Sequence, residues 1–189
     1  HDAWLRYWLL AMGVSMDAAK IIPIPPPQMV ANMTAGNMNG YSVGEPWNAV
    51  AVDKKIGFTT IATQDIWTNH PEKALVVSDD FATKRKAELK EVMAAVLDAC
   101  QFCDQEKNIP KVAQTIGTPA IVNAEPEDIE PRLLGEYDLG AGLGTKSFGA
   151  RRMRFFREGE TTVPRASEVI WFLAQYQRFG YLDKAPAYE

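Results

Sequence analysis

Residues 21–47 read Ile-Ile-Pro-Ile-Pro-Pro-Pro-Gln-Met-Val-Ala-Asn-Met-Thr-Ala-Gly-Asn-Met-Asn-Gly-Tyr-Ser-Val-Gly-Glu-Pro-Trp, and this stretch decides the fold. The β-branched residues at 21–24 are bounded by prolines, which predicts a short buried strand. A helix is expected to begin at Pro27, and residues 40–43 form a second predicted strand. Another helix opens at Pro46, where a missing N–H costs least. Strand, helix, strand and helix with short joints are typical of a parallel α/β sheet, whose ligands lie at the strand ends.

The rest of the chain continues this alternation. β-branched and apolar runs predict further strands at residues 59–63 and 73–78, separated by an irregular loop at 64–71. Alternating charged and apolar residues at 151–156 predict a strand that turns back as a hairpin with residues 161–163. Apolar periodicity and capping residues predict helices at residues 2–12, 47–55, 87–103, 110–116, 131–134 and 165–179, with a further short helix capped by Ser78.

Composition and charge exclude several classes of protein. The chain has 189 residues and 47% apolar content, which is enough for a packed core. A net charge of −4 and a pI near 5.3 argue against a broad nucleic-acid surface. No run is long enough to span a membrane, and no signal peptide opens the chain. Because His1 is not an initiator residue, we expect a processed product or a piece of a longer protein. Four arginines are expected on a solvated or partner-binding face: Arg151, Arg152, Arg154 and Arg157.

Two apparent motifs do not support a catalytic or metal site. Cys100 and Cys103 continue an apolar helix stripe, and no second cysteine pair accompanies them, which favours a helix face over a redox or metal site. The glycine-rich run at residues 139–147 lacks the contiguous Gly-Lys-Ser/Thr of a phosphate loop and the third glycine of a dinucleotide loop. No Gly-x-Ser-x-Gly elbow is present. We therefore expect no enzyme activity, no metal and no cofactor.

Polar residues at the predicted strand ends form the candidate site. Lys73 follows a loop and supplies a point charge that suits a small anion. His1 supplies an imidazole donor if residues precede it. Glu45 competes with an anion for the positive helix N-terminus, so it is expected either to pair with Lys73 or to help bind a cation. The full set is Gln28, Glu45, Trp47, Gln64, His70, Lys73 and His1.

The pattern Pro-Pro-Pro-Gln-Met-Val-Ala-Asn-Met-x-x-Gly-Asn-Met-x-Gly-Tyr-x-Val-Gly-Glu-Pro-Trp, preceded by residues 4–9, resembles the nitrate-binding and bicarbonate-binding proteins of bacterial ABC importers. The resemblance covers residues 1–104 and reappears at 135–138 and 171–182. It implies a type II periplasmic-binding fold, in which two α/β lobes close around a small ligand. Residues 1–104 are then an α/β ligand-binding lobe with a parallel or mixed sheet flanked by helices. Residues 105–189 are a C-terminal extension of loops, a hairpin and a final helix.

The same resemblance implies which residues bind the ligand. His1 and Lys73 match positions that contact the oxyanion in the nitrate-type branch, whereas the bicarbonate-type branch carries Gln and Glu there and adds a calcium ion. A basic pair suits a monoanion without a metal, which points to nitrate or nitrite. The predicted ligand-binding set is His1, Lys73, Glu45, Trp47 and Gln28.

The resemblance also implies partners and a compartment, and it leaves alternatives open. As an importer's solute-binding component, the protein would work with ABC permease and ATPase subunits, outside the cytoplasm and without nucleic acid. The alternatives are a bicarbonate-binding protein, and a regulatory or sensor version that is cytoplasmic or fused to a transporter ATPase. A thiamine-pyrimidine synthase-like enzyme shares the fold, but its cysteine-rich motif is absent. The family's first lobe is also absent from this sequence, so we expect these 189 residues alone to bind nitrate weakly or not at all.

Overall fold

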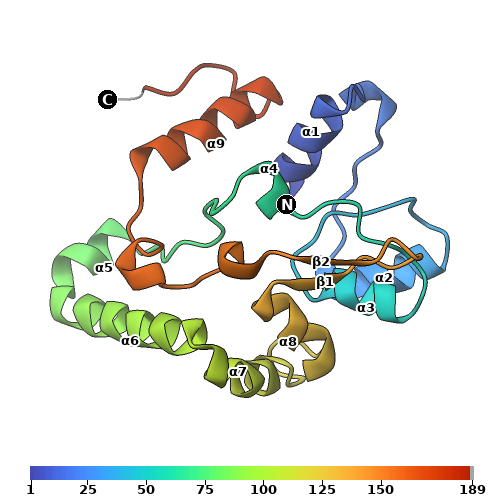
Figure 1. The fold of residues 1–189 in the computed structure, drawn as a ribbon. Coiled ribbons are helices and arrows are strands. Elements are labelled where there is room, and N and C mark those ends of the chain that lie inside the picture. The colour runs from blue at the N-terminus through green and yellow to red at the C-terminus, as the bar shows by residue number, and fades with distance from the viewer. Residues whose placement is uncertain (188–189) are drawn as a thin grey trace.

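Helices joined by long extended segments make up most of the computed structural model, which describes residues 1–187 (Figure 1). The α-helices are α1 (Asp2–Ala11), α2 (Pro26–Thr34), α3 (Trp47–Asp53), α4 (Thr63–Ile66), α5 (Asp79–Lys84), α6 (Lys86–Asp104), α7 (Ile109–Ile116), α8 (Pro126–Leu134) and α9 (Ala166–Arg178). The two strands are β1 (Glu136–Asp138) and β2 (Thr145–Ser147). Short 3₁₀ turns are η1 (Met16–Ala18), η2 (Glu106–Asn108), η3 (Gly149–Arg151) and η4 (Arg157–Gly159).

The helices predicted from periodicity and capping residues are confirmed, except that α8 begins at Pro126 and not at the predicted residue 131. Pro26 occupies the first turn of α2, and Gly36 follows that helix with a positive φ of 74°. The Ser78 hydroxyl accepts the Phe81 N–H at 3.2 Å and so caps α5. These signals are local, which is why they could be read from the sequence. The short helix α4 lies where an irregular loop was predicted.

The strands predicted at residues 21–24, 40–43, 59–63 and 73–78 are wrong for the described residues. None of them belongs to a ladder, and the described chain contains one two-stranded sheet in place of the predicted parallel sheet. Pro23 removes one donor from the first segment, and Pro25 removes the donor that would follow it. The third segment makes one backbone bond to a distant part of the described chain, from the Thr59 N–H to the Leu139 carbonyl at 2.8 Å; its other backbone bonds are accepted from Asp65 and Trp67, in and just after α4. A strand needs a neighbour, and the residues described here do not provide one.

The one sheet is an antiparallel hairpin in which Glu136 lies opposite Ser147 and Asp138 lies opposite Thr145. Its loop contains Gly140, Gly142 and Gly144, all with positive φ. These glycines form the run that resembles a phosphate loop in the sequence. Their role is to turn the chain between β1 and β2.

The hairpin predicted at residues 151–163 is also wrong. The turns η3 and η4 occupy this region, and the Asp104 carboxylate accepts the N–H groups of Phe155, Phe156 and Arg157. Because a side chain from α6 already satisfies these backbone donors, they are not free to pair with a second strand.

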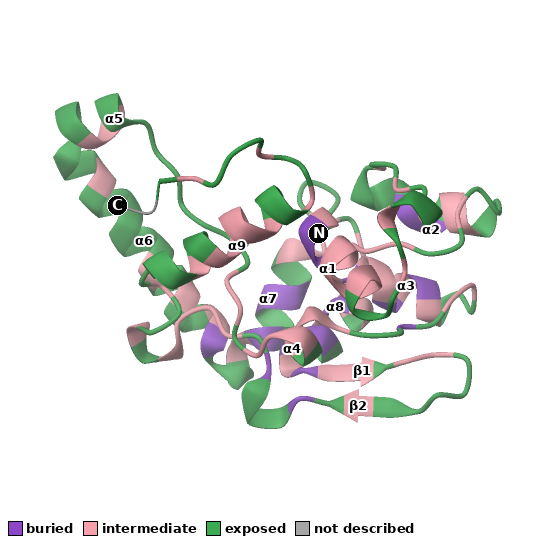
Figure 2. Cartoon of the chain, turned by 90° about the horizontal axis from the view of Figure 1, so that it is seen from above, coloured by how far each residue is buried: buried purple, intermediate pink, exposed green. Residues whose placement is uncertain are grey.

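Two apolar clusters hold the elements together. Between α7 and α8, the buried side chains are Ile109, Val112, Ala113, Ile129 and Leu133. The second cluster is aromatic and joins α1, residues 67–70 and α9: Trp4, which is 5% exposed, lies 5.1 Å from Trp171 and 4.6 Å from His70 between ring centroids. Figure 2 shows buried residues on α1, α3, α7 and α8, whereas α5 and α6 are largely exposed. Within residues 1–187, no helix is both long and apolar enough to cross a membrane.

Candidate functional site

The turn at Gly44–Trp47 opens α3 and holds two of the predicted ligand-binding residues. The Glu45 carboxylate accepts the Ala49 N–H at 3.3 Å, inside the first turn of the helix. The Tyr41 hydroxyl donates to the Trp47 carbonyl at 3.0 Å. Glu45 and Trp47 are both half-buried. The turn is therefore held by hydrogen bonds to Tyr41, which precedes it in the chain, and to Ala49, which follows it.

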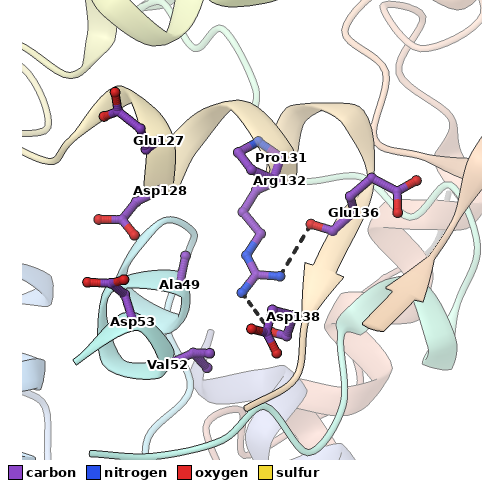
Figure 3. A pocket seen from close by; sticks show the side chains of 9 residues that line it. All are labelled: Ala49, Val52, Asp53, Glu127, Asp128, Pro131, Arg132, Glu136 and Asp138. Carbon is purple, nitrogen blue, oxygen red and sulfur yellow. Dashed lines mark hydrogen bonds between the residues drawn. The ribbon is translucent and has the colours of Figure 1, made fainter. Parts of the chain in front are cut away.

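A buried arginine from α8 is the ionic partner of Glu45. The Arg132 side chain is 6% exposed, and its Nε lies 3.7 Å from the Glu45 carboxylate. Its guanidinium donates to the carbonyls of Glu136 at 3.4 Å and Asp138 at 3.1 Å (Figure 3). It also lies 4.4 Å from the Tyr137 ring centroid. Arg132 thus connects the turn, α8 and the hairpin. One interpretation of the sequence expected Glu45 to pair with Lys73. In the structure Glu45 pairs with Arg132 instead.

Burial shifts the pKa values of Glu45 and of two tyrosines close to it, Tyr41 and Tyr137. It raises the pKa of the Glu45 carboxyl above its ordinary value, although Arg132 and the Ala49 N–H act in the opposite direction. Burial and the nearby Glu45 charge raise the pKa of Tyr41 to about 12. The same two causes raise the pKa of Tyr137 to about 12, against the effect of Arg132. Both phenols are therefore neutral hydrogen-bonding groups at ordinary pH.

His1 lies against this turn. A Cβ placed on Gly44 would be 3.4 Å from the His1 ring, so the glycine leaves room for the imidazole. His1 itself is exposed. The structure therefore brings together three of the five predicted ligand-binding residues around one turn, namely His1, Glu45 and Trp47.

Lys73 and Gln28 lie outside the contacts of that turn. The Lys73 side chain is 81% exposed, and its ammonium pairs with Glu72 at 2.8 Å. Surface pairs of this kind contribute little free energy, so the lysine is free to exchange this partner for a ligand. Gln28 is exposed in the first turn of α2, and the Asn32 side-chain amide donates to its backbone carbonyl.

Gln64 and His70, the other polar residues predicted at strand ends, have structural partners. The His70 ring contacts the Thr63 hydroxyl through Nε2 at 2.7 Å and the Pro71 carbonyl through Nδ1 at 2.9 Å. A carbonyl only accepts, so Nδ1 carries the proton. The Gln64 amide donates to the Arg151 carbonyl and accepts the Asn69 N–H. Both side chains shape the segment that leads to Lys73.

A cavity of about 170 Å³ lies between α3, α8 and β1. Figure 3 shows carboxylates around it, and Arg132 is the one basic residue among the nine that line it. So many carboxylates repel a small anion. None of the five predicted ligand-binding residues lines this cavity, which is therefore a poor candidate for an oxyanion site. The lining consists of Ala49, Val52, Asp53, Glu127, Asp128, Pro131, Arg132, Glu136 and Asp138.

Cys100 and Cys103 are free thiols on α6, and burial raises the pKa of both. Across residues 1–187, no group of three or more His, Cys, Asp or Glu side chains is placed to hold a metal ion. These thiols are protonated at neutral pH and therefore weak nucleophiles.

Comparison with known proteins gives a consistent result. The model of the NMT1-like family matches residues 1–117. The nitrate/nitrite binding protein NrtA of Synechococcus elongatus is 42% identical over 183 residues, which are 96% of this chain and 41% of that protein. The nitrate import ATP-binding protein NrtC of Synechocystis is 35% identical over 95% of this chain and 27% of its own length. The bicarbonate-binding protein CmpA of Synechococcus elongatus is 27% identical over 96% of this chain and 41% of its own.

A solved structure gives the same assignment for the fold. The crystal structure of the periplasmic nitrate-binding protein NrtA from Synechocystis has a TM-score of 0.93 and 33% identity, covering 98% of this chain and 48% of that one. The predicted α/β, type II periplasmic-binding fold is confirmed, as is the predicted resemblance. The chain spans about half the length of that protein.

Proposed function

Because this chain belongs to the NMT1-like family, we propose that it is part of the solute-binding component of an ABC importer for nitrate or nitrite. The observation that carries the proposal is the 42% identity to a nitrate/nitrite binding protein, which extends over 96% of the chain. The bicarbonate-binding relative is less similar, at 27%. The fold supports the same proposal, since the solved relative is a periplasmic nitrate-binding protein.

In this proposal His1 and Lys73 are the charged donors to the oxyanion. Both are exposed, and neither is committed to a strong internal partner. Trp47 and Glu45 shape the turn beside His1, and Gln28 supplies an exposed amide at the start of α2. Residues 1–104 would form the ligand-binding lobe, and residues 105–189 would be an extension that packs on it. The Asp104 carboxylate bonded to residues 155–157 connects the two parts.

The proposed partners are a small oxyanion and the permease and ATPase subunits of the importer, in an extracytoplasmic compartment. The named relatives include an import ATP-binding protein, so the same module also occurs within transporter ATPases. We therefore retain a regulatory domain of the same family as the second candidate. Residues beyond this sequence distinguish the two, since an ATPase domain favours the regulatory form.

Anion titrations test the proposal. The protein to be titrated is a chimera, which we call the completed protein. It joins this chain to the part of Synechocystis NrtA that the structural match does not cover. Calorimetry without calcium is expected to show saturable nitrate binding and weaker bicarbonate binding. Lys73→Gln removes a charge-assisted hydrogen bond worth about 1.5–3 kcal/mol, so nitrate affinity should fall by roughly ten- to a hundredfold.

The matched control is Lys90→Gln, which removes the same charge from an exposed position on α6. Its nitrate affinity is expected to equal that of the unsubstituted protein. Binding of bicarbonate without binding of nitrate would refute the assignment of the anion. Equal losses in the two variants would refute the role of Lys73.

A further inference from the structure

The aromatic cluster lies between the two segments that carry His1 and Lys73. His1 directly precedes α1, and the Leu5 N–H in the first turn of that helix donates to the His1 carbonyl at 3.0 Å. Trp4 lies in the same turn, and its ring centroid is 4.6 Å from that of His70. Lys73 follows His70 by three residues. The helix that begins after His1 and the segment that leads to Lys73 therefore meet in this cluster.

Trp171, on α9, packs against both segments at once. Its ring centroid lies 5.1 Å from that of Trp4 and 5.2 Å from that of Trp67, whereas the rings of Trp4 and Trp67 are 6.3 Å apart. It also lies 5.4 Å from the ring of Tyr7 on α1. Figures 1 and 2 both show α9 beside α1. Because Trp171 is closer to each of the two indoles than they are to each other, its bulk limits how closely they approach.

The residues that follow α9 hold the first turn of α1 by a second contact. The Tyr181 hydroxyl donates to the Asp2 carboxylate, which also accepts a hydrogen bond from Arg6 Nε at 3.0 Å. The Arg6 guanidinium lies 5.4 Å from the Tyr181 ring centroid. Asp2 is the residue after His1, so the position of α9 bears directly on the position of His1.

The segment before Lys73 is also held by its own hydrogen bonds. The His70 ring bonds the Thr63 hydroxyl at 2.7 Å and the Pro71 carbonyl at 2.9 Å. The Asn69 N–H donates to the Gln64 side chain at 3.1 Å. Trp67 lies within this bonded segment, so a displacement of its ring would be passed along the backbone toward Lys73.

We propose that Trp171 is a positioning residue that sets the separation of His1 and Lys73. The proposal rests on the proposed function, because it takes these two residues as the charged donors to the anion. A small oxyanion accepts hydrogen bonds from both only if each donor lies within about 2.7–3.2 Å of it. A binding site of this kind must be held to within about 0.5 Å. A helix outside residues 1–117, where the family model matches, would thus set the affinity of a site whose proposed contacts lie within residues 1–73.

A distance measurement without any anion tests the spacing. Cys100→Ser and Cys103→Ser remove the native thiols, and spin labels are attached through Ala11→Cys, at the exposed end of α1, and Lys73→Cys. Pulsed electron paramagnetic resonance of the 189-residue chain gives the distance distribution between the labels. Trp171→Leu removes the ring and should shift or broaden this distribution. Trp171→Phe keeps a ring between the two segments and should restore it.

Nitrate titration of the completed protein tests the consequence for binding. Trp171→Leu should weaken nitrate binding about tenfold, and Trp171→Phe should stay within about threefold of the unsubstituted protein. In a Lys73→Gln background, Trp171→Leu should weaken binding by no more than about twofold, because one of the two positioned donors is gone. A general loss of stability would instead weaken binding by the same factor in both backgrounds.

Tyr176→Leu is the matched control on the same helix. Tyr176 is 37% exposed, and its ring lies beside those of Phe172 and Tyr181, so both measurements should match the parent. Trp67→Leu opens the other side of the Trp171 contact and should act as Trp171→Leu does, so the test does not depend on one variant. Circular dichroism establishes that each variant is folded.

The inference is overturned if the distance distribution of Trp171→Leu equals that of the parent, or if Tyr176→Leu changes it as much. It is also overturned if the loss of nitrate affinity is the same with and without Lys73. A completed protein that binds no nitrate would refute the proposed function, and the distance measurement would still decide whether Trp171 sets the spacing.

Discussion

Replacing Asp104 by alanine is expected to lower the free energy of unfolding by about 3 kcal/mol. This carboxylate, 8% exposed as a residue, accepts the N–H groups of Phe155 at 2.7 Å, Phe156 at 3.1 Å and Arg157 at 2.8 Å. It also pairs with the Arg154 guanidinium at 3.1 Å. Alanine would leave three backbone donors and one charge without this acceptor. Urea unfolding at neutral pH measures the loss.

The effect of Asp104 should depend on pH in a defined direction. Burial acts to raise the pKa of this carboxyl, but the three N–H groups and Arg154 outweigh it, so the pKa lies below its ordinary value. A pKa that is lower in the folded state than in the unfolded state contributes stability above the unfolded value. That contribution is lost as the pH falls through the folded pKa. The difference between wild type and Asp104→Asn should therefore shrink as the pH falls below about 4.

The control for Asp104 is Asp98→Asn, at an exposed position on the same helix. Its free energy of unfolding should stay within about 0.5 kcal/mol of wild type. A difference between Asp104→Asn and wild type that is the same at pH 7 and pH 3 would contradict the assigned role of the carboxylate.

Replacing Arg132 by alanine is expected to cost about 3 kcal/mol or more of unfolding free energy. The arginine is buried, holds two carbonyls of β1 and neutralises Glu45. Without it, the pKa of Glu45 should rise further above its ordinary value. An acid whose pKa is higher in the folded state loses stability as the pH rises, so this variant should become less stable toward neutral and alkaline pH.

A double substitution separates the charge effect from lost packing at Arg132. Glu45→Gln in the Arg132→Ala background removes the unpaired carboxylate and should recover part of the stability at pH 7. Arg151→Ala, at an exposed position in η3, is the control and should be close to neutral. If the double variant is no more stable than Arg132→Ala at any pH, the Glu45–Arg132 pair is not the cause of the loss.

Helices and strands differed in how well the sequence predicted them. A helix is specified by residues within it and at its ends, namely its apolar stripe and its capping residues. The helices α2, α5 and α9 each contain or adjoin such residues. A strand is specified by the neighbour with which it pairs, and residues 21–24 and 73–78 have none among the described residues. Their β-branched composition favours a strand, but pairing depends on residues outside the segment.

The residues of the candidate site also differ in whether the sequence could predict them. Glu45 and Trp47 were predicted as residues at strand ends and His1 from the family resemblance, and the structure brings the three together. Arg132 was missed because the sequence predicted only a short helix at residues 131–134, within a region of loops. Ile129, Arg132 and Leu133 nevertheless share one face, and all three are buried. An arginine on an apolar stripe was therefore the available signal, although its partner Glu45 could be found only from the tertiary fold.

In the proposed function, this chain supplies one side of an oxyanion site that binds its anion only when the other lobe covers it. Two charges 4 Å apart attract by about 1 kcal/mol in water and about 4 kcal/mol at the lower effective dielectric of a partly buried site. Nitrate titration of the 189-residue chain, beside the completed protein in the same buffer, tests whether the second lobe is required for binding. We expect saturable heat from the completed protein and none from the chain alone at micromolar nitrate. Submicromolar nitrate binding by the chain alone would contradict the account.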